Sequence, residues 1–112
     1  MKKKIIIIGS GFSSISAACY LSRSGHEVHV YEKNKTFGGR ARRLIKDEFL
    51  FDMGPSWYWM PDIIDSFFND FNKSTSDFFK LKKLNPAYQV YFGKKDSLLI
   101  EDSLEKICKV FE

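Results

Sequence analysis

The hydrophobic pattern at the start of the chain predicts a strand, a helix and a second strand. An unbroken run of isoleucines ends the segment from Lys4 to Ile8, and such β-branched runs are typical of parallel strands covered on both faces. Apolar residues then recur at helical spacing from Ser13 to Ser22, and Gly25 follows where a helix end favours a left-handed residue. Glu27 to Tyr31 alternates in the manner of a short strand. The three segments predict a βαβ unit with a right-handed crossover.

The pattern changes after the second predicted strand. Residues 33–42 combine glycines with charged residues and lack apolar periodicity, which predicts a loop. Residues 42–52 predict two short extended pieces that turn at Lys46 and Asp47. A helix is predicted from Pro61 to Phe71, because proline suits a first helical position and an apolar stripe follows it.

The last third of the chain predicts short strands and a final helix. The segments FKLKKL (79–84), AYQVYF (87–92) and SLLI (97–100) predict antiparallel strands, the last two joined across GKKD. Asp102 and Glu105 resemble a capping box with Asp102 as the cap, so a helix is expected after them. That helix shows no stop signal before the last residue.

Composition excludes several classes of protein. A chain of 112 residues with 44% hydrophobic residues predicts one folded α/β domain with a modest core. The net charge of +4 comes mainly from scattered lysines without a nucleic-acid-binding motif, so no nucleic-acid partner is expected. The two cysteines lack metal-ligand spacing, which predicts no metal site and reduced thiols in the cytoplasm. Because every apolar run is far shorter than a bilayer span, any membrane contact is expected to be peripheral.

The turn after the first strand predicts a dinucleotide site. Gly9 permits a tight turn, and Gly11 lets the backbone approach a pyrophosphate that rests on the helix N-terminus. Glu32 ends the second strand, where a carboxylate accepts hydrogen bonds from ribose hydroxyls and repels the 2′-phosphate of NADP. Ser14 replaces the third glycine of the usual pattern. That glycine serves helix packing, so a small residue leaves the phosphate site intact.

The next loop favours FAD over NAD. The chain passes soon after Glu32 into Gly38-Gly39-Arg40, a loop that can approach a second part of a cofactor. With this loop included, residues 5–41 resemble the FAD-dependent carotenoid desaturases of the phytoene dehydrogenase type, within the amine oxidase-like flavoproteins. The narrower segments FDMGPSWYWMP (51–61) and NPAYQVYF (85–92) resemble the phytoene dehydrogenase branch.

The resemblance implies a set of residues around FAD. Gly9, Gly11, Phe12 and Ser13 would hold the pyrophosphate, and Glu32 the adenosine ribose. Gly39 and Arg40 would contact the phosphate and ribityl region, while the flavin side would be lined by Gly54, Pro55 and Ser56. No residue can be assigned as a catalytic acid or base. Residues 1–44 are expected to form the dinucleotide-binding unit and its loop, and residues 45–112 the start of inserted strands and helices.

The function that the resemblance implies is carotenoid desaturation. An FAD-dependent oxidoreductase of this kind removes hydrogen from a lipid-soluble polyene, in the cytoplasm or peripherally at the membrane. Members of the family are considerably longer than 112 residues, so the chain is expected to be an N-terminal portion, inactive alone. Two alternatives stay open: another amine oxidase-like flavoprotein or a carotenoid isomerase or saturase relative, and a non-catalytic nucleotide-binding remnant. The sequence leaves the oligomeric state open.

Overall fold

The chain folds as two units. The structure is a computed structural model that describes residues 1–55 and 57–112. Its internal contacts divide the chain into Met1–Trp59 and Met60–Glu112. The predicted subdivision at residue 44 stays a prediction.

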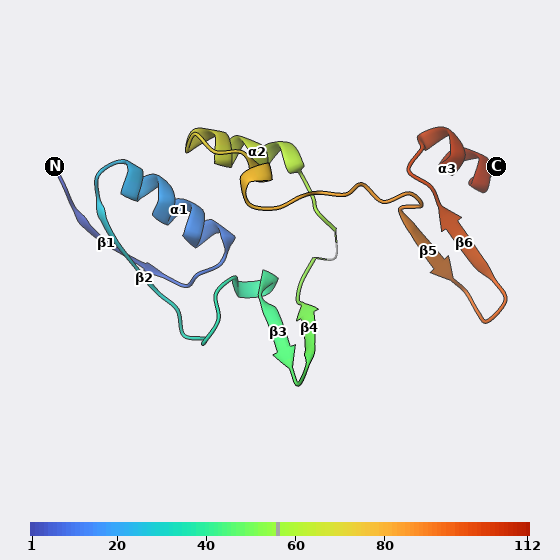
Figure 1. Cartoon of the computed structure of the whole chain (residues 1–112), viewed down its shortest axis with the longest axis horizontal. Helices are drawn as coiled ribbons and strands as arrows, with labels where there is room; N and C mark the ends of the chain where they lie inside the picture. Colours follow the sequence, from blue (N-terminus) through green and yellow to red (C-terminus); the bar gives the residue numbers. More distant parts are fainter. Residues whose placement is uncertain (56) are drawn as a thin grey trace. The chain divides into compact units, whose positions relative to one another are not determined.

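The first unit begins with the predicted βαβ unit. Strand β1 (Lys4–Ile8) lies parallel to β2 (Glu27–Tyr31), with Ile5 opposite Val28 and Ile7 opposite Val30. Helix α1 (Phe12–Arg23) connects the two strands and packs against both of them, as Figure 1 shows. The α/β fold class and the three elements at the start of the chain are therefore confirmed.

Helix α1 ends as the sequence predicts. Gly25 has a φ of +85°, in the left-handed region that glycine adopts without a Cβ penalty. Its amide donates to the carbonyl of Ser22 at 2.9 Å, which satisfies one of the last helical carbonyls. The chain can therefore reverse directly into β2.

The sheet is covered on one face within the described residues. Exposure alternates along β1: Ile5 and Ile7 are half-buried, whereas Ile6 and Ile8 are 59% and 79% exposed. Within the described residues α1 supplies cover on only one side, so a strand covered on both faces stays a prediction for the intact protein. Two apolar side chains of β1 therefore face outward.

A loop and a hairpin complete the first unit. A single 3₁₀ turn, η1 (Gly39–Ala41), interrupts the predicted loop. Strands β3 (Arg43–Lys46) and β4 (Phe49–Asp52) then pair antiparallel, so the two predicted extended pieces are confirmed. Asp47 makes the reversal with a φ of +55°, a conformation that Asp tolerates better than most residues.

The second unit begins with α2 (Pro61–Asp70), where Pro61 occupies the first turn as predicted. The 3₁₀ turn η2 (Thr75–Asp77) follows, and its capping box joins Ser74 and Asp77. Aromatic rings from the helix and this turn contact each other, with the rings of Phe68 and Phe78 4.8 Å apart. The apolar stripe of α2 therefore packs against the residues that follow it.

The remaining elements are a hairpin and a helix. Strands β5 (Tyr88–Tyr91) and β6 (Ser97–Ile100) pair antiparallel across the predicted turn, and α3 (Leu104–Phe111) follows them. Figure 1 shows this hairpin leading into the helix. The prediction of these strands and of a final helix is confirmed.

Two sequence predictions in this unit are wrong. Residues 79–84 are not a strand, because among the described residues each sheet is a single pair and offers this segment no partner. Asp102 is not the cap of α3, since Ser103 occupies that position. The carboxylate of Asp102 instead pairs with the ammonium of Lys83.

Candidate functional site

The candidate site begins at the turn between β1 and α1. Gly9 has a φ of +97°, and its amide donates to the carbonyl of Tyr31 at 2.7 Å, which ties the turn to the end of β2. Gly11 caps the helix, and its carbonyl accepts from the amide of Ile15 at 3.0 Å. The amides at the start of a helix have no partner within the helix, so those of Phe12 and Ser13 can donate to an anion.

Two further loops approach this turn with their backbones. A Cβ added at Gly39 would lie 3.1 Å from the Cα of Gly11, tighter than nearly all real Cβ contacts. A Cβ at Gly54 would lie only 2.5 Å from the carbonyl oxygen of Arg40. The amide of Gly38 donates to the carbonyl of Ser10 at 3.0 Å. Glycine is therefore needed at position 54, and it is favoured at position 39 by the close contact and by a φ of +59°, so that the three loops can meet.

These loops border an open cavity of about 680 Å³ in the first unit. That volume falls within the range of small-molecule and cofactor sites. The residues that line it come from the helix start, the glycine loop and the end of the hairpin: Gly11, Phe12, Ser13, Ser14, Gly38, Arg40, Ala41, Gly54 and Pro55. The helix amides thus lie beside an open volume and beside the cationic side chain of Arg40.

The structure brings most of the predicted site residues together. Six of them line this cavity: Gly11, Phe12, Ser13, Arg40, Gly54 and Pro55. The other three described residues adjoin the same loops: Gly9 forms the turn, Gly39 contacts Gly11, and Glu32 bonds Ser10. Ser56 lies outside the described residues. The cavity wall also includes Ser14, Gly38 and Ala41, which the sequence analysis did not assign to the cofactor.

Four hydrogen bonds hold the carboxylate of Glu32. Its Oε2 accepts from the amide and the hydroxyl of Ser10, each at 2.8 Å. Its Oε1 accepts from the amide of Asn34 at 2.9 Å and from the Nδ2 of Asn34 at 2.7 Å. These donors, led by the Asn34 amide and then the Ser10 hydroxyl, lower the pKa of Glu32 from 4.5 to about 2. Glu32 is therefore anionic at neutral pH.

Three further residues near this site, outside the cavity lining, also had no role in the sequence analysis. Ser10 and Asn34 bond Glu32, and Arg42 donates from Nη1 to the carbonyl of Gly39 at 2.9 Å. Ser10 stands between the two glycines of the turn, where only the glycines have an assigned role. A polar side chain two positions after the expected carboxylate was the available signal for Asn34, whereas Ser10 reaches Glu32 only through the pairing of the two strands.

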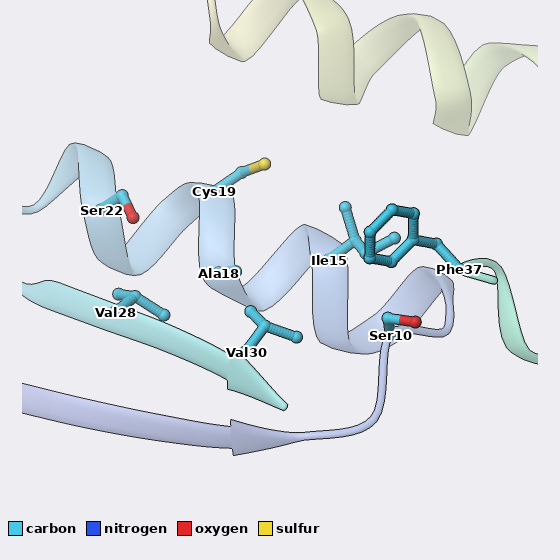
Figure 2. Close-up of a pocket in the computed structure, with 8 residues that line it drawn as sticks. All are labelled: Ser10, Ile15, Ala18, Cys19, Ser22, Val28, Val30 and Phe37. Atoms are coloured by element: carbon cyan, nitrogen blue, oxygen red, sulfur yellow. The ribbon is translucent and has the colours of Figure 1, made fainter. Parts of the chain in front are cut away.

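A second, smaller cavity of about 360 Å³ lies between α1 and β2. Figure 2 shows its lining, with Val28 and Val30 of β2 on one side and Ala18 and Cys19 of α1 on the other. Phe37 and Ile15 lie at the end where the helix begins. Its lining is mainly apolar, whereas the larger cavity is lined by helix amides and an arginine. The smaller cavity therefore provides few hydrogen-bond partners for a charged ligand.

Within the described residues, no helix is both long and apolar enough to cross a bilayer. Among the same residues, no three His, Cys, Asp or Glu side chains gather as metal ligands would.

The comparison with known families agrees with this geometry. The model of the NAD(P)-binding Rossmann-like domain family matches residues 7–73, more than half of the chain. The chain belongs to this family. The matched range includes the glycine turn, Glu32 and the loops around the larger cavity. A Rossmann-like domain of this family carries a site for a nucleotide-type cofactor. The glycine turn and the amides at the start of α1 fit such a site.

Individual relatives of this Rossmann-like chain cover almost all of it. The carotenoid 3,4-desaturase of Haloarcula japonica is 42% identical over 108 residues, which are 96% of this chain and 22% of the relative. The 4,4′-diapophytoene desaturase of Staphylococcus aureus strain Newman is 38% identical over 109 residues, 97% of this chain and 22% of the relative. The chain thus spans about a fifth of the length of these curated relatives.

Proposed function

We propose that the protein carrying this chain is an FAD-dependent oxidoreductase that desaturates a carotenoid-type polyene. The observation that carries the proposal is the open cavity that the start of α1, Arg40 and the Gly54 loop line together. The two desaturases to which the chain is similar support the reaction class. Because the chain covers about a fifth of those relatives, the activity belongs to the whole protein and is proposed for it.

The residues around the larger cavity fit an FAD pyrophosphate. A Cβ at Gly11 would meet nothing within 4 Å, so the backbone there borders open space that a phosphate can approach. The amides of Phe12 and Ser13 would donate to the phosphate oxygens, and Arg40 would add a charged donor. When bound, FAD would accept the two electrons released as desaturation breaks one C–H bond on each of two adjacent carbons, with the two hydrogens leaving as a hydride and a proton. The residues of this chain hold and orient it.

The second loop is the reason to propose FAD over NAD. The backbone of Gly39 lies against Gly11, and the backbone of Gly54 lies against Arg40. Two further segments therefore converge next to the proposed pyrophosphate position. These segments can extend the binding surface toward the far half of a dinucleotide, with Gly54 and Pro55 on the flavin side. The anionic Glu32 would accept from a ribose hydroxyl and would repel a 2′-phosphate, which disfavours NADP.

The names of the relatives support desaturation over the alternatives. Both are desaturases, and one acts on diapophytoene by its printed name, so a lipid-soluble polyene is the proposed substrate class. An isomerase or saturase relative would use the same cofactor half. An inactive remnant would show no turnover even with bound flavin.

The test is the absorbance spectrum of the intact protein that carries this sequence, purified without added cofactor. We expect the two visible bands of an oxidised flavin, and FAD as the nucleotide released on denaturation. Incubation with a polyene in detergent or lipid should then bleach the flavin without oxygen and yield a product with one more conjugated double bond. A colourless protein that releases NAD would overturn the proposal.

A cytoplasmic location with peripheral membrane contact completes the proposal, because the proposed substrate dissolves in lipid. Cell fractionation tests it. We expect part of the protein with the membranes, released by a carbonate wash, and retention after that wash would contradict peripheral contact.

A further inference from the structure

The carboxylate of Glu32 has all of its usual acceptor positions in use. An ionised carboxylate has about four lone-pair positions, two on each oxygen. Oε2 accepts from the amide and hydroxyl of Ser10, and Oε1 accepts from the amide and side chain of Asn34. A ribose hydroxyl can therefore donate to this carboxylate only if one of these four donors gives up its place.

The four donors differ in how readily they can leave. Two are backbone amides, those of Ser10 and Asn34, which can leave only if the main chain moves. The hydroxyl of Ser10 belongs to a buried residue with 2% of its surface exposed. The side chain of Asn34 is exposed, and it can turn into water and keep its hydrogen bonds. The hydrogen bond from the Nδ2 of Asn34 is thus the one that can be broken at the lowest cost in free energy.

We propose that the side-chain amide of Asn34 holds the ribose position on Glu32 and is exchanged for a ribose hydroxyl when the dinucleotide binds. The proposal rests on the proposed function. Ser10 is then the positioning residue, which keeps Oε2 fixed while Oε1 changes partner. The exchange makes Asn34 a competitor of the ligand, so its side chain sets the affinity for the adenosine half.

The experiment measures binding of ADP and of 2′,3′-dideoxy-ADP by calorimetry, with the intact protein after its bound cofactor has been removed. The variant is Asn34→Ala, which keeps the backbone amide and deletes the competing donor. Thr36→Ala is the matched control, because Thr36 is an exposed polar residue of the same loop.

We expect Asn34→Ala to bind ADP about threefold to tenfold more tightly than the parent, the change that one typical net hydrogen bond produces. The affinity for dideoxy-ADP should not change, since that ligand has no hydroxyl to exchange. Thr36→Ala should match the parent with both ligands. Equal or weaker ADP binding by Asn34→Ala, or an equal gain for the dideoxy ligand, would overturn the proposal.

Two results separate this inference from the proposed function. If the parent binds neither ADP nor FAD, the dinucleotide site itself is wrong. If the parent binds both and Asn34→Ala gains nothing, the site stands and the exchange is wrong. A carbon NMR titration of Glu32 in the variant checks that the carboxylate is still held, because its pKa should stay below 4.5 through Ser10 and the Asn34 amide.

Discussion

Alanine at Gly11 and alanine at Gly54 should separate ligand binding from folding. At Gly54 the added Cβ would lie 2.5 Å from the carbonyl oxygen of Arg40, and the residue has a φ of +104°. At Gly11 the added Cβ would meet nothing within 4 Å, and its φ of −73° suits any residue. The methyl group of Gly54→Ala therefore enters a packed contact, whereas that of Gly11→Ala enters the cavity.

The structure gives a magnitude for each variant. A left-handed backbone costs a residue with a Cβ about 1–2 kcal/mol, and overpacking adds about 1–3 kcal/mol, so Gly54→Ala should lose roughly 2–5 kcal/mol. For a protein of more than about 150 residues this lowers the melting temperature by roughly 4–20 °C. Gly11→Ala should change stability by less than about 1 kcal/mol.

Binding should show the opposite order. The methyl group of Gly11→Ala would occupy space that a pyrophosphate needs, so FAD affinity should fall at least about tenfold, which corresponds to about 1.4 kcal/mol. Differential scanning fluorimetry of the cofactor-free protein measures the first effect, and flavin fluorescence titration the second. If Gly11→Ala binds FAD like the parent, the pyrophosphate is not at this turn. If Gly54→Ala melts like the parent, the loops do not meet as described.

Three further variants test other parts of the site. Ser14→Gly should leave FAD affinity within about twofold, measured by the same titration, because Ser14 occupies a packing position; a large loss would give its hydroxyl a direct role. Arg40→Gln should weaken FAD binding about tenfold. Arg43→Gln, an exposed arginine of β3 outside the cavity lining, should not, and equal losses would show a general charge effect. Because the folded pKa of Glu32 is depressed, its carboxylate stabilises the fold fully above pH 4.5 and loses this effect as the pH falls toward 2. The melting temperatures of the parent and Glu32→Gln should therefore differ at neutral pH and converge in acid, and a constant difference would contradict the hydrogen bonds to Glu32.

The local pattern was sufficient to predict the βαβ unit. The isoleucine run, the helical spacing after Gly11 and the left-handed position of Gly25 each depend on near neighbours in the sequence, and the observed elements agree within a residue or two. The hairpins were predictable for the same reason, since each strand finds its partner across a short turn.

The errors arise where a distant partner decides the structure. Residues 79–84 alternate like a strand, yet a strand needs a neighbour, and the described residues supply none there. Asp102 has a good capping residue type and pairs instead with Lys83, about twenty positions away. The side chain of Ser10 meets Glu32 only after β1 and β2 have paired, so spacing along the chain could not predict that contact. Asn34 lies two positions after Glu32, so its contact is local and was open to prediction.

An experimental structure of the intact protein with its copurified cofactor tests the central claim most directly. We predict FAD with its pyrophosphate oxygens within hydrogen-bond distance of the amides of Phe12 and Ser13, and its adenosine ribose on Glu32. A cofactor whose pyrophosphate lies away from the start of α1 would contradict the account.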